Sequence, residues 1–583
     1  MDYKELVEVY EDLEKTTKKL GKTYILSRIF KKASEEDLKY LPYLLQGIIF
    51  TNYDERELGV SQKLIVKVIS TATGIETSRI ETFWKEEGDL GKVAERLLKK
   101  SKQQTLYQEK LTIKKVFMNL QKLPEFEGKG SQEKKIQLVS KLLNNSSPLE
   151  AKFIVNTILN QLRIGVAAGL LRDAIVWAFF EKEIKLNYDK EENILDADKE
   201  SYKKYADLVQ NAYDLKSDFS QVAIMAKKGI KMLEHTSLEV GRPVNVMLYQ
   251  KAKDIEDAFN TVGKPAAFEY KFDGFRLCIH KKDNEIILFT RRQENVTKQF
   301  PEVINSVRNY AKGKDFILDA EAVGFDKKTG KYLPFQAISQ RIKRKYDIKE
   351  ISEKYPVELN AFDVLYFNGK SLINEPFKKR RQILETIIPK NIDKKIKIAK
   401  QLITSDIKEA ENFFNESISK GEEGVMAKNL EAPYKPGSRV GNGVKIKPEV
   451  ENLDLVITAA EWGTGKRSSW LSSFYVSCRK EDKFLEIGKV STGGKEKDEL
   501  GLSFNQLTKL LKPNILEEKG RYVKIKPKIV IEVGYAEIQK SPTYESGFAL
   551  RFPRIIQLRT MDKLLRDINT LEDVKRLYKK QKR

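Results

Sequence analysis

Cysteine and histidine are scarce in this sequence of 583 residues, which contains two of each. The two thiols, Cys278 and Cys478, are too few for a disulfide framework or for a four-cysteine zinc module. We expect both to be small buried apolar side chains. His235 and His280 lack the spacing of a metal-binding pair, so we expect structural roles for them.

Long apolar runs are also missing. The longest, from Gly165 to Phe180, is interrupted by Arg172 and Asp173, whereas a membrane-spanning helix needs about 18 or more apolar residues. The N-terminal segment MDYKELVEVYEDLEK lacks the basic and then apolar order of a secretory signal peptide. We therefore expect no membrane association and a cytoplasmic location.

Acidic residues are outnumbered by basic ones, 84 against 107, which gives a formal net charge of +23. Such a charge favours a polyanionic partner, because neutralised phosphates release condensed counterions. A lysine-rich solubilising surface, as in many thermophile proteins, explains the charge equally well. The hydrophobic fraction of 40% indicates a folded chain rather than a disordered polycation, and the length suggests roughly three or four domains.

Residue periodicity changes along the chain. Leu6, Val9, Tyr10 and Leu13 are spaced as on one helix face, and few stretches of residues 1–235 alternate as strands do. Short β-rich segments, such as 285–290 and 316–325, begin after about Pro243 and are mixed with helical ones.

Beyond Pro448 the segments 453–459, 474–478 and 529–535 are typical of short strands in a small barrel. We therefore predict a multidomain protein. Its expected parts are an all-α domain over 1–239, an α+β domain over 240–448 and a β-barrel domain over 449–583.

One candidate for chemistry is Lys271-x-Asp273-Gly274, at a strand-to-turn transition in the middle part. Alone it is a weak signal, because Asp-Gly is a common turn whose neighbouring lysine is then an ordinary solvated side chain. A series of further segments follows it in order. They are FTRR at 289–292, LDAEAV at 318–323, FDVLY at 362–366, EEGVMAK at 422–428 and VKIK at 444–447.

In order and spacing these segments resemble the motifs of the covalent nucleotidyltransferases, and specifically of the ATP-dependent DNA ligases. RIGV at 163–166 with LRDAI at 171–175 resembles the helical DNA-binding domain of archaeal and eukaryotic replicative ligases. EWG at 461–463, EIQKSP at 537–542 and LRFPR at 550–554 resemble their C-terminal barrel. The resemblance, strongest to archaeal ligases, covers essentially the whole chain. It implies an all-α DNA-binding domain, an α+β nucleotidyltransferase (adenylation) domain and a β-barrel OB-fold domain.

The resemblance implies that Lys271 is the catalytic nucleophile, which takes AMP from ATP as a phosphoamide and expels pyrophosphate. An attacking amine must be neutral, whereas an ordinary lysine with a pKa near 10.4 is protonated at pH 7, a handicap of about 4 to 5 kcal/mol. Neighbouring cations and desolvation lower the pKa of a lysine. We therefore expect a site rich in cations.

Carboxylates in the motif series are expected to hold a metal. Mg²⁺ takes oxygen ligands and bridges to substrate phosphates. By resemblance Glu321 and Glu423 hold Mg²⁺, or alternatively Mn²⁺, and Glu321 also lies near the ribose. An isolated glutamate without such a series is more often a solvated residue at a strand edge.

Fixed cations stabilise the charge on a transferring phosphoryl group. Arg276, Arg291, Lys445 and Lys447 match the positions at which the family contacts phosphate and nucleotide. On a strand Lys445 and Lys447 point the same way, which suits one anion. For these two lysines an ordinary solvated strand face is the alternative.

Three further residues match the family's nucleotide contacts. Phe362 stands at the position of the aromatic that stacks on adenine, and Glu269 at that of the residue that reads the exocyclic amine. Lys428 is a further contact. Packing in the core is the alternative for Phe362.

The sequence departs from the family pattern in two segments. Val444 stands where the family usually has an aromatic residue before the Lys-x-Lys pair. The family's closing Arg-x-Asp-Lys appears as RTMDK at 559–563, which is one residue longer. Arg559, Asp562 and Lys563 are therefore candidates for orienting the pyrophosphate leaving group.

The segment QQTLY at 103–107 resembles the clamp-binding peptide that some archaeal ligases carry at this position. By this resemblance Gln103, Leu106 and Tyr107 contact a sliding clamp. Packing of Leu106 and Tyr107 against their own domain is an equal alternative.

The function implied is that of an ATP-dependent DNA ligase, a monomer that seals nicks in double-stranded DNA in replication, repair and recombination. It would act through lysyl-AMP and DNA-adenylate intermediates. An RNA ligase or a capping-type guanylyltransferase shares the Lys-x-Asp-Gly chemistry but generally lacks the helical domain. A non-catalytic DNA-binding scaffold of the same fold is the alternative from another class. NAD-dependent ligases are excluded, because two cysteines cannot build their zinc module.

Overall fold

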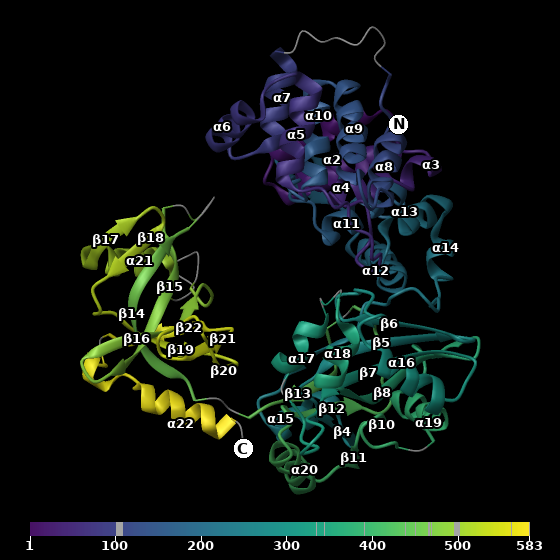
Figure 1. The fold of residues 1–583 in the computed structure, drawn as a ribbon. Helices are drawn as coiled ribbons and strands as arrows, with labels where there is room; N and C mark the ends of the chain where they lie inside the picture. The colour runs from purple at the N-terminus through teal and green to yellow at the C-terminus, as the bar shows by residue number, and fades with distance from the viewer. Residues whose placement is uncertain are drawn as a thin grey trace. The chain divides into compact units, whose positions relative to one another are not determined.

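The computed structural model describes residues 1–100, 109–333, 335–342, 344, 346–389, 391–437, 439–448, 451–463, 467, 469–494, 502–560 and 562–581. The chain divides into two compact units, and Figure 1 labels its helices and strands. Unit 1 contains Met1–Ala252, Glu256–Ser405 and Ala427–Val444, and unit 2 contains Lys253–Ile255, Asp406–Met426 and Lys445–Arg583. The division into three domains at 239 and 448 stays a prediction.

The N-terminal part of unit 1 is helical, as its periodicity predicts. Along α1 a capping box of Asp2 and Glu5 begins the helix, and Leu6, Tyr10 and Leu13 are fully buried on one face. The helices are α1 (Tyr3–Lys15), α2 (Lys19–Lys32), α3 (Glu35–Leu38), α4 (Leu41–Gln46), α5 (Gln62–Thr73), α6 (Thr77–Glu87), α7 (Leu90–Lys100), α8 (Ile113–Gln121), α9 (Ser131–Asn144), α10 (Pro148–Ile158), α11 (Ala168–Phe179), α12 (Lys199–Lys216), α13 (Phe219–Lys228) and α14 (Ile230–Glu234).

This region is not all-α, which corrects the prediction. Strands β1 (Asn187–Asp189) and β2 (Ile194–Asp196) form an antiparallel hairpin between α11 and α12. Each strand has three residues, of which the outer two are exposed. Strands so short and so little buried leave no alternating apolar pattern in the sequence.

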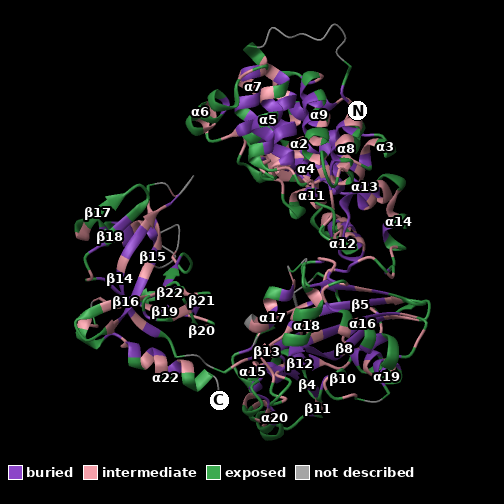
Figure 2. Cartoon of the chain, in the orientation of Figure 1, coloured by how far each residue is buried: buried purple, intermediate pink, exposed green. Residues whose placement is uncertain are grey.

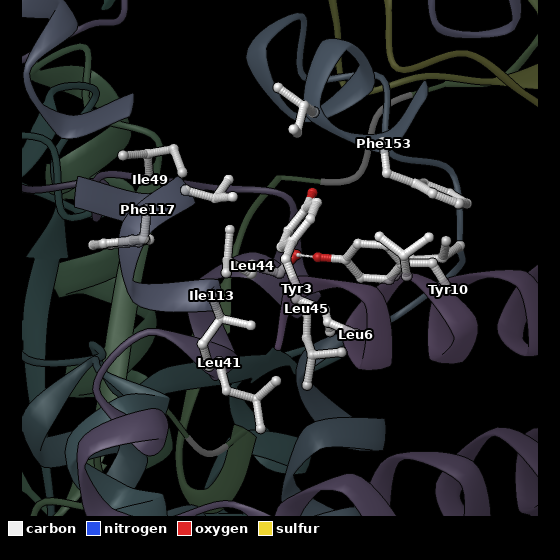
Figure 3. Packing of buried hydrophobic residues seen from close by; sticks show 14 of the residues in the cluster. Tyr3, Leu6, Tyr10, Leu41, Leu44, Leu45, Ile49, Ile113, Phe117 and Phe153 are labelled. Carbon is white, nitrogen blue, oxygen red and sulfur yellow. Dashed lines mark hydrogen bonds between the residues drawn. The ribbon is translucent and has the colours of Figure 1, made fainter. Parts of the chain in front are cut away.

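These helices share one apolar cluster, and Figure 3 shows the part of it that α1, α4, α8 and α10 contribute. The rings of Tyr10 in α1 and Phe153 in α10 lie 5.0 Å apart between centroids. The Tyr10 hydroxyl donates a hydrogen bond to the carbonyl of Leu44 in α4 at 2.8 Å, and Phe117 of α8 packs in the same cluster. The tyrosine thus buries its ring without leaving its hydroxyl unsatisfied.

Two sheets follow the helical part. The first has the strand order β10-β8-β7-β5-β6, with β9 paired to β8, and the second has the order β11-β4-β12-β13-β3. The strands are β3 (Leu248–Lys251), β4 (Ala266–Lys271), β5 (Phe275–Lys282), β6 (Glu285–Thr290), β7 (Asp315–Gly324), β8 (Val357–Phe367), β9 (Lys370–Ser371), β10 (Ile396–Ile398), β11 (Gln401–Thr404), β12 (Gly424–Asn429) and β13 (Arg439–Ile446). The helices are α15 (Ile255–Val262), α16 (Pro301–Tyr310), α17 (Phe335–Ile342), α18 (Ile348–Lys354), α19 (Phe377–Ile387) and α20 (Ile407–Ser419).

One face of the first sheet is apolar. Phe275 and Leu277 of β5, Ala320 of β7, and Leu359 and Ala361 of β8 belong to one buried cluster. Because successive side chains of a strand point to opposite faces, the intervening residues lie on the other face. That face carries Arg276 and Glu321 of the predicted site.

The C-terminal part of unit 2 is an antiparallel sheet with the order β16-β15-β14-β18-β17, in which β19 pairs with both β14 and β22. Figure 2 shows the buried residues along β14 and β15. The elements are β14 (Leu453–Trp462), β15 (Leu471–Lys480), β16 (Lys483–Val490), α21 (Phe504–Leu511), β17 (Ile515–Lys519), β18 (Tyr522–Ile525), β19 (Val530–Gly534), β20 (Glu537–Lys540), β21 (Phe548–Arg551), β22 (Arg554–Leu558) and α22 (Leu571–Gln581).

Several local predictions are confirmed. The predicted strand 285–290 is β6, and 316–325 is β7 shifted by one residue. Cys278 and Cys478 are buried free thiols. Burial lowers the pKa of His280 to about 3, and its Nδ1 accepts a hydrogen bond from the Gly241 amide at 3.1 Å.

Among the described helices, none combines the length and apolarity that crossing a bilayer requires.

Asp214, near the end of α12, connects the helical part of unit 1 to the α/β part. Its Oδ1 accepts hydrogen bonds from Gln210 Nε2 at 3.1 Å and from Asn245 Nδ2 at 2.9 Å. A Cβ atom on Gly437 would lie 2.3 Å from the same oxygen, so this close approach requires glycine. Burial raises the pKa of Asp214 to about 6, although both hydrogen bonds oppose the shift.

Replacing Asp214 with asparagine should make stability less dependent on pH. The pKa of this carboxyl rises from about 3.9 in an unfolded chain to about 6 on folding. The cost of ionising it in the folded state therefore grows between these pH values and is fully present above them. We expect Asp214→Asn to raise the free energy of unfolding by about 2 to 3 kcal/mol at pH 8 and by little at pH 4, measured by urea denaturation. Asp207→Asn, at an exposed position of α12, is the control. A gain of equal size at both pH values would contradict the interpretation.

Candidate nucleotide-binding site

Lys271 is the last residue of β4, and Asp273 and Gly274 form the turn into β5. A Cβ atom on Gly274 would lie 2.4 Å from the carbonyl oxygen of Ala322 and 2.9 Å from Cγ of Glu321. Only glycine allows this approach. The Lys-x-Asp-Gly turn is therefore packed against β7 beside Glu321, which is the metal-binding carboxylate predicted from the sequence.

Glu269 is buried, with 1% of its surface exposed, and three donors from three other elements hold its carboxylate. Arg381 Nη1 of α19 and Gln401 Nε2 of β11 each lie 3.0 Å from Oε1. Lys428 Nζ of β12 lies 2.5 Å from Oε2. A buried carboxylate needs such partners, because desolvation otherwise penalises its charge heavily.

Phe362 lies at a bulge of β8. Ala361 pairs with Ala320 of β7 and Asp363 pairs with Asp319, so Phe362 is the extra residue. The bulge places its half-buried ring 5.4 Å from the Arg276 guanidinium carbon and 4.9 Å from Lys428 Nζ, measured to the ring centroid. Phe362 is thus among the polar residues of the site, which favours stacking over core packing.

Arg276 extends from β5 into a buried hydrogen-bond network. Its Nε donates to Asp319 Oδ1 at 2.7 Å, and its Nη2 makes a second bond to the same carboxylate. Nη1 donates to the carbonyl of Met247 at 2.8 Å, and the Tyr434 hydroxyl donates to Asp319 at 3.0 Å. Arg276 therefore joins β5, β7 and the segment before β3, and its contact with nucleotide stays a prediction.

Glu423 and Lys447, which belong to unit 2, form an ion pair with 2.5 Å between Nζ and Oε2. The next residue, Gly424, has φ +137°, and a Cβ there would lie 2.1 Å from the carbonyl oxygen of Ile446. This contact brings the start of β12 against the end of β13, where Lys445 and Lys447 lie. Two of the predicted site residues are therefore paired with each other.

The remaining predicted residues are described by their own surroundings. Arg291 is exposed in the turn after β6. Arg559 and Lys563 of unit 2 are near acidic side chains: Lys563 Nζ is 3.4 Å from Asp454, and Arg559 is 3.2 Å from Asp562 and 3.6 Å from Asp454. Their role in orienting a leaving group stays a prediction. Gln103, Leu106 and Tyr107 lie outside the described residues.

The sequence interpretation missed residues that hold the site. Arg381 is in a basic run at the start of α19 that looks like a solvated helix face. Its neighbour Arg380 is buried against Asp363 of β8, with Nε–Oδ1 and Nη2–Oδ2 distances of 2.8 and 2.9 Å. This pair anchors α19 so that Arg381 reaches Glu269. Gln401 and Tyr434 carry no signal in the sequence, whereas Asp319 is part of the LDAEAV segment.

Comparison with known proteins identifies the family of the chain. The family model for the DNA ligase N terminus matches residues 2–176, the ATP dependent DNA ligase domain matches 246–447, and the ATP dependent DNA ligase C terminal region matches 467–563. A DNA ligase of Nanoarchaeum equitans is 45% identical over 100% of this chain and 99% of its own. A DNA ligase of Thermococcus fumicolans is 42% identical with the same coverage.

A solved structure named Pmar-Lig_PreS3 covers 95% of this chain and 99% of its own with a TM-score of 0.54 and 16% identity, which supports the fold. The chain belongs to the family of ATP-dependent DNA ligases, and its activity is the sealing of nicks in DNA. The resemblance seen in the motif series is confirmed, and the RNA ligase, guanylyltransferase and scaffold alternatives are not favoured.

Replacing Arg381 with methionine should weaken the use of ATP. Glu269 would keep Lys428 and Gln401 but lose a buried charged partner, and hydrogen bonds to charged groups contribute about 1.5 to 3 kcal/mol. We expect the kcat/KM of enzyme adenylylation to fall by about tenfold or more, with partial recovery in Arg381→Lys. Rates of AMP transfer to the protein at varied ATP measure this.

Lys378→Met is the matched control, because Lys378 lies in the same helix and makes an exposed ion pair with Glu431 at 2.6 Å. Exposed pairs contribute about 0 to 1 kcal/mol. Equal losses in the Arg381→Met and Lys378→Met proteins would mean that Arg381 does not act through Glu269.

Proposed function

We propose that Lys271 becomes adenylylated and that β4 carries both this nucleophile and the residue that reads adenine. Glu269 and Lys271 are two residues apart on β4 and therefore project to the same side. Lys428 binds Glu269 and also lies against Phe362. This connection between nucleophile strand, carboxylate and aromatic ring is the observation that best supports the proposal.

The reaction has three steps. Lys271 Nζ attacks the α-phosphorus of ATP, a P–N bond forms as the P–O bond to pyrophosphate breaks, and the amine loses a proton. A 5′-phosphate oxygen at a nick then takes the AMP, which breaks the P–N bond and returns a proton to Lys271. The 3′-hydroxyl finally attacks that 5′-phosphate, joins the strand and releases AMP. Lys445 and Lys447 balance phosphate charge during these transfers.

Mg²⁺, or Mn²⁺ in its place, would neutralise phosphate charge when bound. The described residues contain no cluster of three or more His, Cys, Asp or Glu side chains that could enclose a metal. Magnesium commonly takes one or two protein carboxylates, with phosphates and water completing its shell. In this proposal Glu321 and Glu423 would each supply one such carboxylate.

The three parts have distinct roles in this proposal. The helical part binds the backbone of nicked double-stranded DNA, and the antiparallel sheet of unit 2 is the OB-fold domain that closes on the substrate. The role in replication, repair and recombination follows from this activity. Clamp contact, the monomeric state and the cytoplasmic location stay predictions.

Lys271→Ala should abolish sealing of a nick, because no other side chain is expected to carry AMP. Incubation with labelled ATP and magnesium should label the wild type but not the variant, and mass spectrometry should map one AMP to the peptide containing Lys271. Lys281→Ala, at a lysine of β5 outside the proposed site, is the control. Sealing by the Lys271 variant, or labelling by GTP and not by ATP, would contradict the proposal.

Affinity for nicked duplex DNA should fall steeply with salt. The net charge of +23 and the absence of any need for sequence readout favour contacts to phosphates, which release counterions. We expect a loss of about 100-fold or more between 50 and 200 mM salt, measured by fluorescence anisotropy with the Lys271→Ala protein to prevent turnover. A flat response would exclude phosphate-dominated binding.

A further inference from the structure

Asn360 is a buried polar residue next to the predicted site. It lies in β8, and its Cα partner in β7 is Glu321, whose partner in β5 is Arg276. On the other side its parallel partner in β10 is Lys397. Directly opposed residues of neighbouring strands point to the same face of a sheet. Four polar side chains therefore form one row across four strands, which we call the polar row.

The polar row lies on the face opposite the apolar cluster. The residues before and after Asn360, Leu359 and Ala361, both pack into that cluster, so the Asn360 side chain projects to the face of Glu321. Phe362 follows two residues later on the same strand. Asn360 thus lies beside the carboxylate that is expected near the ribose.

The Asn360 amide is only 3% exposed, and its Nδ2 is buried without a hydrogen-bond partner among the described residues. The two cations of the polar row are engaged elsewhere. Arg276 binds Asp319, and Lys397 pairs with Asp393 at 2.5 Å and with Glu358 at 3.4 Å. A buried amide without a partner is destabilising and rare in native proteins, and it therefore calls for an explanation.

The charges near Asn360 limit what could satisfy it. Glu321 is opposite, and Glu358, fully buried, lies two residues earlier on the same face. Two carboxylates disfavour a phosphate at this position. A sugar hydroxyl is neutral and both donates and accepts a hydrogen bond, so it can pair with either end of the amide.

We propose that Asn360 is a specificity-determining residue that hydrogen-bonds a ribose hydroxyl of the bound adenine nucleotide beside Glu321. The proposal rests on the adenylylation of the protein by ATP described above. In the free protein the amide lacks this partner, and the bound sugar supplies it. Asn360 then makes the enzyme prefer ATP over a nucleotide that lacks the contacted hydroxyl, because the amide would otherwise stay unpaired.

The test compares adenylylation by ATP, 2′-deoxyATP and 3′-deoxyATP in the wild type, Asn360→Ala and Asn360→Leu. We expect the wild type to prefer ATP by about tenfold or more over one of the two deoxynucleotides. Both variants should lose activity with ATP by about the same factor as the wild-type preference. Their rate with that deoxynucleotide should stay unchanged. The deoxynucleotide that behaves in this way identifies the hydroxyl.

Leucine is similar in size to asparagine and removes the unpaired amide. Asn360→Leu should therefore melt at the same or a higher temperature than the wild type, while its preference for ATP disappears. A purely structural Asn360 would instead lower the melting temperature and leave the preference unchanged. Asn156→Ala is the matched control, because Asn156 of α10 is also 3% exposed with an unpaired amide oxygen among the described residues.

Equal use of all three nucleotides by the wild type would overturn the proposal, and so would variants that lose activity equally with all three. Failure of the wild type to take AMP from ATP would instead refute the proposed function. The two failures are therefore distinguishable.

Discussion

The site depends on the partners that hold the buried carboxylate of Glu269 inside the protein. Desolvation of a carboxylate costs several kcal/mol, and only good partners offset it. Arg381, Gln401 and Lys428 supply these partners from α19, β11 and β12. Because Glu269 is two residues before Lys271, the same interaction fixes the strand that carries the proposed nucleophile. Arg381 is in turn held in place because its neighbour Arg380 forms a buried pair with Asp363.

Close backbone approaches complete the arrangement. Gly274 packs against Ala322 and Glu321, and Gly424 packs against Ile446. A side chain at either position would push apart segments that carry site residues. The bulge at Phe362 has a related effect, because an unbroken pairing of β7 and β8 would change the direction of this ring. The backbone geometry at Gly274, Gly424 and Phe362 thus sets where the neighbouring site residues lie.

Three cations among the predicted site residues are paired with carboxylates in this structure. Lys428 binds Glu269, Arg276 binds Asp319, and Lys447 binds Glu423. In the C-terminal part Arg559 and Lys563 are close to Asp454. The excess positive charge of the chain therefore resides mainly in other lysines and arginines. A polyanionic substrate that contacts these cations must share them with their carboxylates or displace the carboxylates. Specific binding is therefore more selective than attraction to a basic surface.

The sequence by itself determined the helical and β-rich regions, the positions of several strands and the motif series with Lys271, because local periodicity and short spacings are properties of neighbouring residues. It missed the β1–β2 hairpin, whose strands are too short to leave a pattern. Only the tertiary structure decided which residues hold Glu269, that Arg276 is committed to Asp319 and Tyr434, and that Asn360 lies beside Glu321. These facts depend on the pairing of strands and helices that are far apart in the chain. That pairing is decided by burial and by hydrogen-bond satisfaction across the whole fold, and no local pattern records it.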